Sequence, residues 1–227
     1  MIYALFDIDN TLVYIEDGVD EDSSRIMFKK IFKVDADESF VETYSKTEQC
    51  IISDVLKKVG QPQKIIPNEA YQAWGEALVQ ILISRPARVL PGIIELLSDL
   101  SKNKNVKLNL LTGNSVPRSE SKLKSAQLDD FFRNKQTGRL EGIFGEISKV
   151  RGDLLKFFRL QLNPDDKVII IDDSLLGAKM SKEQNVPIIS VATGKIKEEE
   201  LRSYTPFVFL NFAENRWKKA VEIITSI

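Results

Sequence analysis

The sequence contains no histidine and a single cysteine, Cys50. Without histidine, every mechanism that uses an imidazole base is excluded, including the Ser-His-Asp and Cys-His types. One cysteine cannot form an internal disulfide or supply the usual ligands of a zinc site, and the count fits a reducing cytoplasm. Proton transfer near neutral pH therefore falls to carboxyl groups or lysines with shifted pKa values.

Long apolar runs are also missing, since those present are as short as Val168–Ile171, well below the roughly 20 residues of a membrane span. Met1–Phe6 has no basic start, so we expect no signal peptide. The 32 basic and 33 acidic residues nearly cancel, so no net field attracts nucleic acid or an anionic membrane. We expect a cytoplasmic protein that binds neither nucleic acid nor membranes, as a monomer or a homodimer.

Hydrophobic residues make up 43% of the 227 residues, enough for a substantial core. Five short, almost continuously apolar runs have the pattern of strands buried on both faces. These runs are Ile2–Phe6, Val106–Leu111, Val168–Ile171, Ile188–Val191 and Phe207–Leu210.

Segments with helical periodicity lie between and after the later runs. They are Ile93–Leu100, Ser115–Leu128, Asp153–Leu162, Leu175–Gln184 and Trp217–Ile227. Strands that alternate with helices predict an α/β fold with a doubly wound, Rossmann-like parallel sheet. In such sheets the ligand site lies beyond the carboxyl ends of the strands.

The stretch after the first strand does not alternate in this way. Residues 14–90 contain three amphipathic helical segments, Ser24–Phe32, Glu48–Val59 and Glu69–Ile83, and no convincing strand. We therefore predict a core domain of residues 1–13 and 91–227, into which a helical domain of residues 14–90 is inserted. The hinges are expected near residues 13–18 and 88–91.

Two aspartates, Asp7 and Asp9, follow the first strand. Residues two apart project to the same side of an extended chain, so their charges would repel and a bound cation would relieve this. An ordinary turn is the alternative, since Asp and Asn favour turns.

Thr112, Gly113 and Asn114 follow the second predicted core strand. A hydroxyl group and the N–H groups of a turn that contains glycine can hold an anion, and a helix N-terminus beyond adds positive charge. An ordinary helix cap is again the alternative. Asp172 and Asp173 end a third strand. Mg²⁺ prefers carboxylate oxygens together with phosphate and water, so these acids and Asp7 predict a magnesium site.

The ordered motifs resemble those of the haloacid dehalogenase-like hydrolases, over the whole chain. The resemblance implies that Asp7 attacks phosphorus and forms an aspartyl-phosphate. Asp9 then protonates the leaving group, activates water and binds Mg²⁺ through its backbone carbonyl. Asp173, with Asp172 in support, completes the metal site, and Thr112 binds the phosphoryl group. The resemblance also implies that Thr11, Gly113 and Asn114 bind substrate, and that residues 14–90 form a helical cap.

The family also supplies one cation to the phosphoryl oxygens, and two residues compete for this role. Members usually carry a lysine, which points to Lys149, but a subset with Thr-Gly-Asn in the second motif carries an arginine just before a helix. We therefore favour Arg151. A second departure concerns the metal site, where Asp172 stands at the usual glycine and Gly177 at the usual later aspartate. Asp172 is expected to compensate.

The cap loop at residues 45–48 provides the candidates for specificity, Lys46 and Thr47, although Ser45 or Thr47 could equally cap a helix. The resemblance implies Mg²⁺-dependent hydrolysis of a small phosphorylated metabolite. A phosphomutase of the same superfamily is the closest alternative, and a catalytically idle phosphate-binding or regulatory protein is the rival from another class. Asp9 argues against a dehalogenase, and Lys46 leaves open an imine-forming phosphonate hydrolase.

Overall fold

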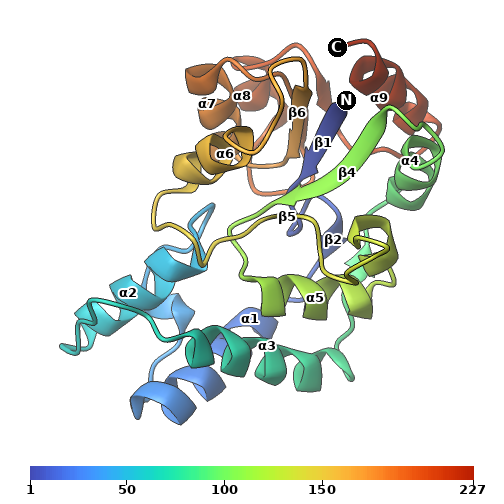
Figure 1. Ribbon diagram of the computed structural model, residues 1–227. Coiled ribbons are helices and arrows are strands. Elements are labelled where there is room, and N and C mark those ends of the chain that lie inside the picture. Colours follow the sequence, from blue (N-terminus) through green and yellow to red (C-terminus); the bar gives the residue numbers. More distant parts are fainter.

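Six parallel strands form one sheet in the order β5-β4-β1-β6-β7-β8 in the computed structural model, which describes residues 1–227 (Figure 1). The predicted doubly wound sheet is confirmed, and all five predicted runs form strands. In this sheet only the edge strand β5 escapes the sequence pattern, because Glu141 and Gly142 interrupt its apolar run. The strands are β1 (Ile2–Phe6), β4 (Val106–Leu111), β5 (Gly142–Ile143), β6 (Lys167–Asp172), β7 (Ile188–Val191) and β8 (Val208–Phe209).

Alternate residues of the strands face two separate apolar layers. Leu5 belongs to the layer beneath α6 (Arg151–Arg159) and α7 (Leu175–Gln184), whereas its neighbours Ala4 and Phe6 face the opposite layer. Helices therefore cover both faces of the sheet, as buried parallel strands require. The helices against the second face are α4 (Ile93–Leu100), α5 (Val116–Ser125) and α9 (Arg216–Thr225), and α8 (Glu198–Arg202) lies beside α7 (Figure 1).

The strand register sets the position of the site. Phe6 pairs with Leu110 on one side and with Ile171 on the other. The next residues therefore leave the sheet at the same edge. Asp7, Thr112 and Asp172 lie together because of this register and not because of their spacing along the chain.

The inserted segment folds as a layer of helices below the strand ends (Figure 1). Its apolar cluster includes Met27, Ile52 and Trp74 and is separate from the two layers of the sheet. A two-stranded antiparallel ribbon, β2 (Val13–Tyr14) and β3 (Arg88–Val89), joins it to the core at the predicted hinges. This supports the predicted division into two domains, which stays a prediction. The other elements are α1 (Val19–Met27), a π-helical turn (Phe28–Phe32), a 3₁₀ turn (Glu38–Phe40), α2 (Glu48–Lys58) and α3 (Asn68–Leu82).

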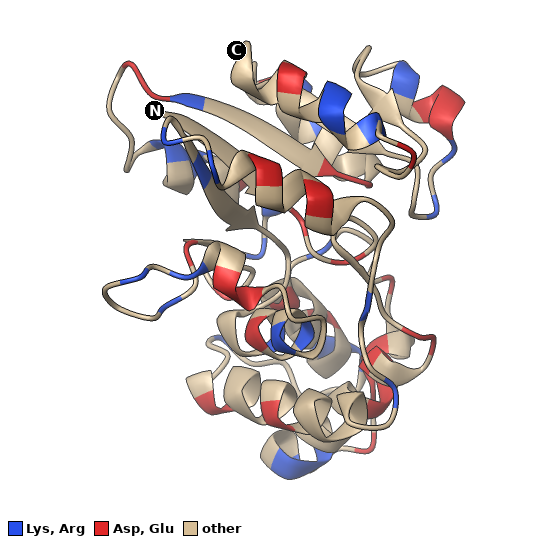
Figure 2. Ribbon diagram, turned by 90° about the vertical axis from the view of Figure 1, so that its right-hand side faces the viewer, with Lys and Arg blue, Asp and Glu red and all other residues tan.

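Helix α1 begins at Val19, five residues before the predicted start. Gly18 adopts the left-handed conformation that ends the hinge, and three acidic residues in the first turn favour the helix N-terminus. Basic and acidic residues are interspersed along the helices that flank the sheet and along those of the inserted segment (Figure 2). No helix of the chain is both long enough and apolar enough to cross a membrane.

The insertion packs tightly on the core through α3 and α5. A Cβ atom added to Gly75 of α3 would lie only 2.5 Å from the Cβ of Pro117, so glycine permits the close approach of the two helices. This contact holds the helical layer against the strand ends.

Candidate active site

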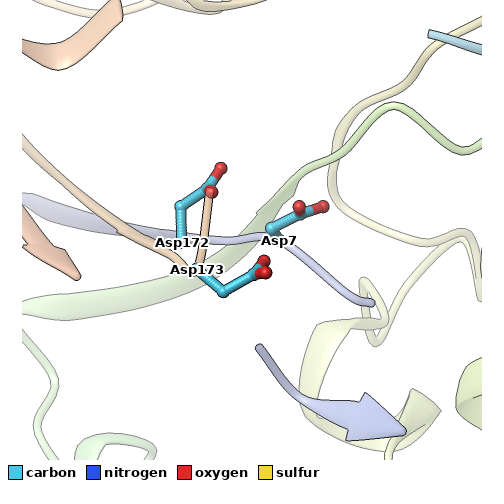
Figure 3. A group of neighbouring side chains, drawn as sticks. All are labelled: Asp7, Asp172 and Asp173. Carbon is cyan, nitrogen blue, oxygen red and sulfur yellow. The ribbon is translucent and has the colours of Figure 1, made fainter. Parts of the chain in front are cut away.

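Three buried carboxylates project from the ends of β1 and β6 (Figure 3). Carboxylate oxygens of Asp7, Asp172 and Asp173 lie within 4.8 Å of one another. Burial raises the pKa of Asp7, and burial together with the charge of Asp172 raises the pKa of Asp173 well above its usual range. Asp173 Oδ2 is buried without a hydrogen-bond partner. Clustered carboxylates with a spare oxygen fit a hard divalent cation such as Mg²⁺.

Arg151 lies among these acids at the first position of α6. Its Nη2 is 2.7 Å from Asp7 Oδ2 and 2.8 Å from Asp172 Oδ2. Burial alone would lower the pKa of this guanidinium, but the two carboxylates raise it, so the side chain stays charged. The side chain of Lys149 is exposed and forms no ion pair. Of the two candidate cations, the fold brings Arg151 to Asp7.

Asp172 is held in place by a second contact, because the backbone N–H of Ser174 donates to its Oδ1 at 2.6 Å. Its carboxyl group lies against the first turn of α7, where Gly177 leaves room for it. The two departures from the family pattern are therefore physically linked.

The turn after β4 places Thr112, Gly113 and Asn114 in the wall of a cavity of about 240 Å³. Thr112 is fully buried, and its Oγ1 accepts hydrogen bonds from the backbone N–H and the side-chain amide of Asn114 at 3.2 and 3.0 Å. Asp7, Asp9, Arg151 and Asp173 line the same cavity. The fold thus brings together the residues of all four sequence motifs.

Both oxygens of Asp9 are engaged. Asn114 Nδ2 donates to Oδ2 and Lys122 Nζ to Oδ1, each at 2.7 Å. Lys122 of α5 is 0% exposed and also donates to Asp20 at 3.1 Å and to Asn114 at 3.2 Å. A fully buried lysine is rare unless it is paired. Lys122 thus orients Asp9, and the sequence analysis missed it.

Arg118 lies one helical turn before Lys122 and faces the inserted segment. It contacts Asp20 at 2.5 Å and Glu48 at 3.1 Å, and its guanidinium stacks over Trp74. The sequence held one signal for these residues, since basic side chains four apart on a predicted helix share a face. Their acidic partners lie far away in sequence and gave no such signal.

The loop at residues 45–48 contacts the second motif directly. The backbone N–H of Glu48 donates to the carbonyl of Gly113 at 2.8 Å. Thr47 is buried and accepts from the N–H of Cys50, so the helix-cap interpretation of Thr47 is confirmed. Lys46 lines the cavity, and its ammonium group pairs with Asp54, outside the cavity lining, at 2.8 Å.

Two further side chains lie close to Asp173. Thr11, which was expected to bind substrate, is buried outside the cavity lining and donates its hydroxyl to Asp173 Oδ1 at 3.3 Å. Tyr44, just before the loop at residues 45–48, lines the cavity, although no motif of the sequence pointed to it. Burial, followed by the charge of Asp173, raises the pKa of its phenol, and the hydroxyl has no partner.

This arrangement agrees with a family comparison. Residues 3–184 match the profile of the haloacid dehalogenase-like hydrolases. The chain belongs to this family. The resemblance drawn from its motifs is therefore confirmed. The sequence matches no curated protein.

Solved structures of similar fold include haloacid dehalogenase-like proteins. CbbY from Rhodobacter sphaeroides, in complex with phosphate, has a TM-score of 0.67 at 18% identity, over 93% of this chain and 95% of that one. A candidate beta-phosphoglucomutase from Thermotoga maritima has a TM-score of 0.59 at 17% identity, over 98% and 99%. A predicted phosphatase from Clostridium acetobutylicum has a TM-score of 0.59 at 19% identity, over 97% and 98%. At these identities the likeness establishes the fold alone.

Proposed function

We propose that this protein is a Mg²⁺-dependent hydrolase of a small phosphate monoester, and that it acts through an aspartyl-phosphate on Asp7. The observation that carries the proposal is the position of the Asp7 carboxylate. It lies in a cavity wall beside two further acids, and Arg151 is 2.7 Å away. A nucleophile between a cation and a metal-binding group suits phosphoryl transfer, which depends on positioning and charge neutralisation.

Residues of the same cavity wall would bind the phosphoryl group and the Mg²⁺ ion. The phosphoryl group of the substrate would lie against Arg151 and Thr112, with the N–H groups of the turn at Gly113 as further donors. Asp7 and Asp173, together with the backbone carbonyl of Asp9, would hold the Mg²⁺ ion. When bound, the ion neutralises charge on the phosphoryl oxygens.

In the first half of the reaction, an oxygen of Asp7 bonds to phosphorus while the bond from phosphorus to the ester oxygen breaks. Asp9 gives its proton to the departing alcohol. Lys122 and Asn114 fix the side chain of Asp9 at the cavity wall, next to the place where that oxygen leaves.

In the second half, Asp9 takes a proton from a water molecule as the water oxygen bonds to phosphorus. The acyl phosphate bond of Asp7 breaks, inorganic phosphate leaves and the Asp7 carboxylate is regenerated. A closed cap would exclude bulk water during this cycle, and the bond from Glu48 N–H to the Gly113 carbonyl holds its loop on the second motif.

A panel of phosphate monoesters, assayed by release of inorganic phosphate with Mg²⁺ and with a chelator, tests the proposal. We expect at least one substrate to be cleaved, with activity lost on chelation and restored by Mg²⁺. Failure to cleave any member would contradict hydrolysis and favour an idle phosphate-binding protein.

A phosphomutase remains the alternative, because a candidate beta-phosphoglucomutase shares the fold. ³¹P NMR of sugar monophosphates distinguishes the two. A hydrolase yields inorganic phosphate, whereas a mutase yields an isomeric sugar phosphate while the total ester stays constant.

A further inference from the structure

The cap side of the cavity is strongly acidic. Six carboxylates of the inserted segment line it, and the only cation that the segment contributes is Lys46. This side would face the alcohol part of a bound ester, because Asp7 and Arg151 take the phosphoryl part. The six residues are Glu16, Asp17, Asp20, Glu21, Glu38 and Glu48.

The two cations next to the acidic residues of this wall, Arg118 and Lys46, are paired with carboxylates. Arg118 is only 3% exposed and is paired with Asp20 and Glu48. Lys46 is paired with Asp54, which lies outside the cavity lining. Lys195 belongs to the core, in the loop whose Gly194 lies against the Asp173 carboxylate, and its side chain is exposed. The cap therefore holds no spare positive charge for a second anionic group of a substrate.

One buried carboxyl group on this wall has no hydrogen-bond partner. Glu38 is 8% exposed, and its backbone N–H is bound by Ser24, but its carboxyl group accepts no hydrogen bond. The nearest cationic atom is Arg118 Nη1 at 4.0 Å, at the limit of an ion pair. Burial, followed by the charge of Asp20, raises the pKa of Glu38 to about 8. The carboxyl group borders the cavity, so a donor on a ligand could bind it there.

We propose that Glu38, with Asp20 and Glu48 around it, forms the leaving-group subsite, and that it selects phosphate esters of polyols or amino alcohols without a second anionic group. This inference rests on the proposed function. A hydroxyl or ammonium group of the substrate donates to Glu38. At neutral pH an ammonium group would favour the ionised form of Glu38, whereas a carboxylate or second phosphate would find no unpaired cation on the cap.

Two pairs of substrates of matched size test this selection. Phosphoethanolamine and phosphoglycolate differ by a protonated aminomethyl group in place of a carboxylate, and glycerol 3-phosphate and 3-phosphoglycerate differ by a hydroxymethyl group in place of a carboxylate. We expect kcat/KM to favour the first member of each pair by at least about tenfold, the effect of roughly one ordinary hydrogen bond or charge contact. A preference for the anionic member of either pair would overturn the subsite.

Glu38→Gln and the matched control Glu69→Gln test the assigned residue. Glu69 is an exposed cap carboxylate outside the cavity. We expect Glu38→Gln to reduce the preference for phosphoethanolamine at least about threefold, and the preference for glycerol 3-phosphate less, because an amide oxygen still accepts from a hydroxyl. Glu69→Gln should retain both ratios. If Glu38→Gln retained them as well, Glu38 would have no part in selection.

Binding measured without turnover separates this inference from the proposed function. Calorimetric titration of the folded Asp7→Asn variant with phosphoethanolamine and phosphoglycolate, in the presence of Mg²⁺, should show the same preference. Equal or reversed affinities would reject the subsite even in a protein that hydrolyses phosphate esters. A retained preference in a protein with no hydrolytic activity would reject only the proposed reaction.

Discussion

The carboxyl group of Asp172 fills the space that a side chain at Gly177 would need. A Cβ atom on Gly177 would lie 2.4 Å from Asp172 Cγ and 2.5 Å from its Oδ2. The usual family arrangement has glycine at the first position and aspartate at the second, and here the two are exchanged. The exchange keeps an acidic group in the same small volume beside Asp173.

Gly177→Ala should therefore damage the site. The added methyl group would displace Asp172 and disturb its contact with Arg151, at an overpacking cost of about 1–3 kcal/mol. We expect kcat/KM for the best phosphate ester to fall at least about tenfold. The control is Gly152→Ala, where the nearest atom to the new Cβ is 3.8 Å away.

The double variant Asp172→Gly/Gly177→Asp tests the exchange itself. It should recover more activity than Gly177→Asp alone, because the new carboxylate then has the space that Asp172 vacates. A double variant no better than the single one would show that the two positions are independent.

Arg151 and Lys149 should differ sharply on substitution. Arg151→Met removes the cation beside Asp7 and should lower kcat/KM by about 10²–10³-fold, the usual effect of losing a charge-stabilising donor. Lys149→Met should stay within about twofold of wild type, since exposed charges contribute little. Comparable losses in steady-state assays of the two variants would reject Arg151 as the phosphoryl-binding cation.

Lys122 should act through Asp9 on kcat more than on KM. Lys122→Met leaves Asp9 without its ammonium partner, and we expect kcat to fall by about 10–100-fold, part of the effect of a general acid–base group. Lys122→Arg should recover part of the lost kcat. A shift in the pH dependence of kcat in Lys122→Met would show that Lys122 positions Asp9. Lys124 is exposed on the same helix, so Lys124→Met is the control. A change confined to thermal stability would make Lys122 purely structural.

Glu38 should make stability depend on pH. Its pKa rises from 4.5 in the unfolded chain to about 8 in the folded protein, so the folded state holds the proton more tightly. The free energy of unfolding should therefore fall as pH rises from about 4.5 to about 8, by a few kcal/mol at most. Urea denaturation of wild type and Glu38→Gln across this range measures the free energy of unfolding of both proteins. The difference between the two values should disappear at low pH. Parallel curves would contradict the buried carboxyl group.

The sequence predicted the elements of the core well, because their signals are local. Continuous apolar runs found β1, β4, β6, β7 and β8, and helical periodicity placed α4 and α7 with the observed bounds. The strand β5 has no continuous apolar run because Glu141 and Gly142 interrupt it, and the small helix α8 is too short for a helical periodicity to show. The start of α1 depended on the glycine hinge at Gly18, which the helical pattern alone does not reveal.

The motif residues were found for a different reason, since a parallel sheet brings strand ends together whatever their separation along the chain. Asp7, Thr112 and Asp173 follow this rule. The contacts of Lys122 and Glu38 depend instead on how α5 and the cap pack, which no short pattern encodes. Thr11 shows the same limit, because its neighbour Asp173 lies 162 residues away.

The most direct test of the account is the turnover of Asp7→Asn, measured as phosphate release with Mg²⁺ beside wild type on the best ester of the panel. The side chain keeps its size but loses the nucleophilic carboxylate, so we expect kcat to fall at least about 10³-fold. Circular dichroism and the thermal midpoint should show an intact fold. Activity retained within about tenfold of wild type in a folded variant would contradict the covalent role of Asp7.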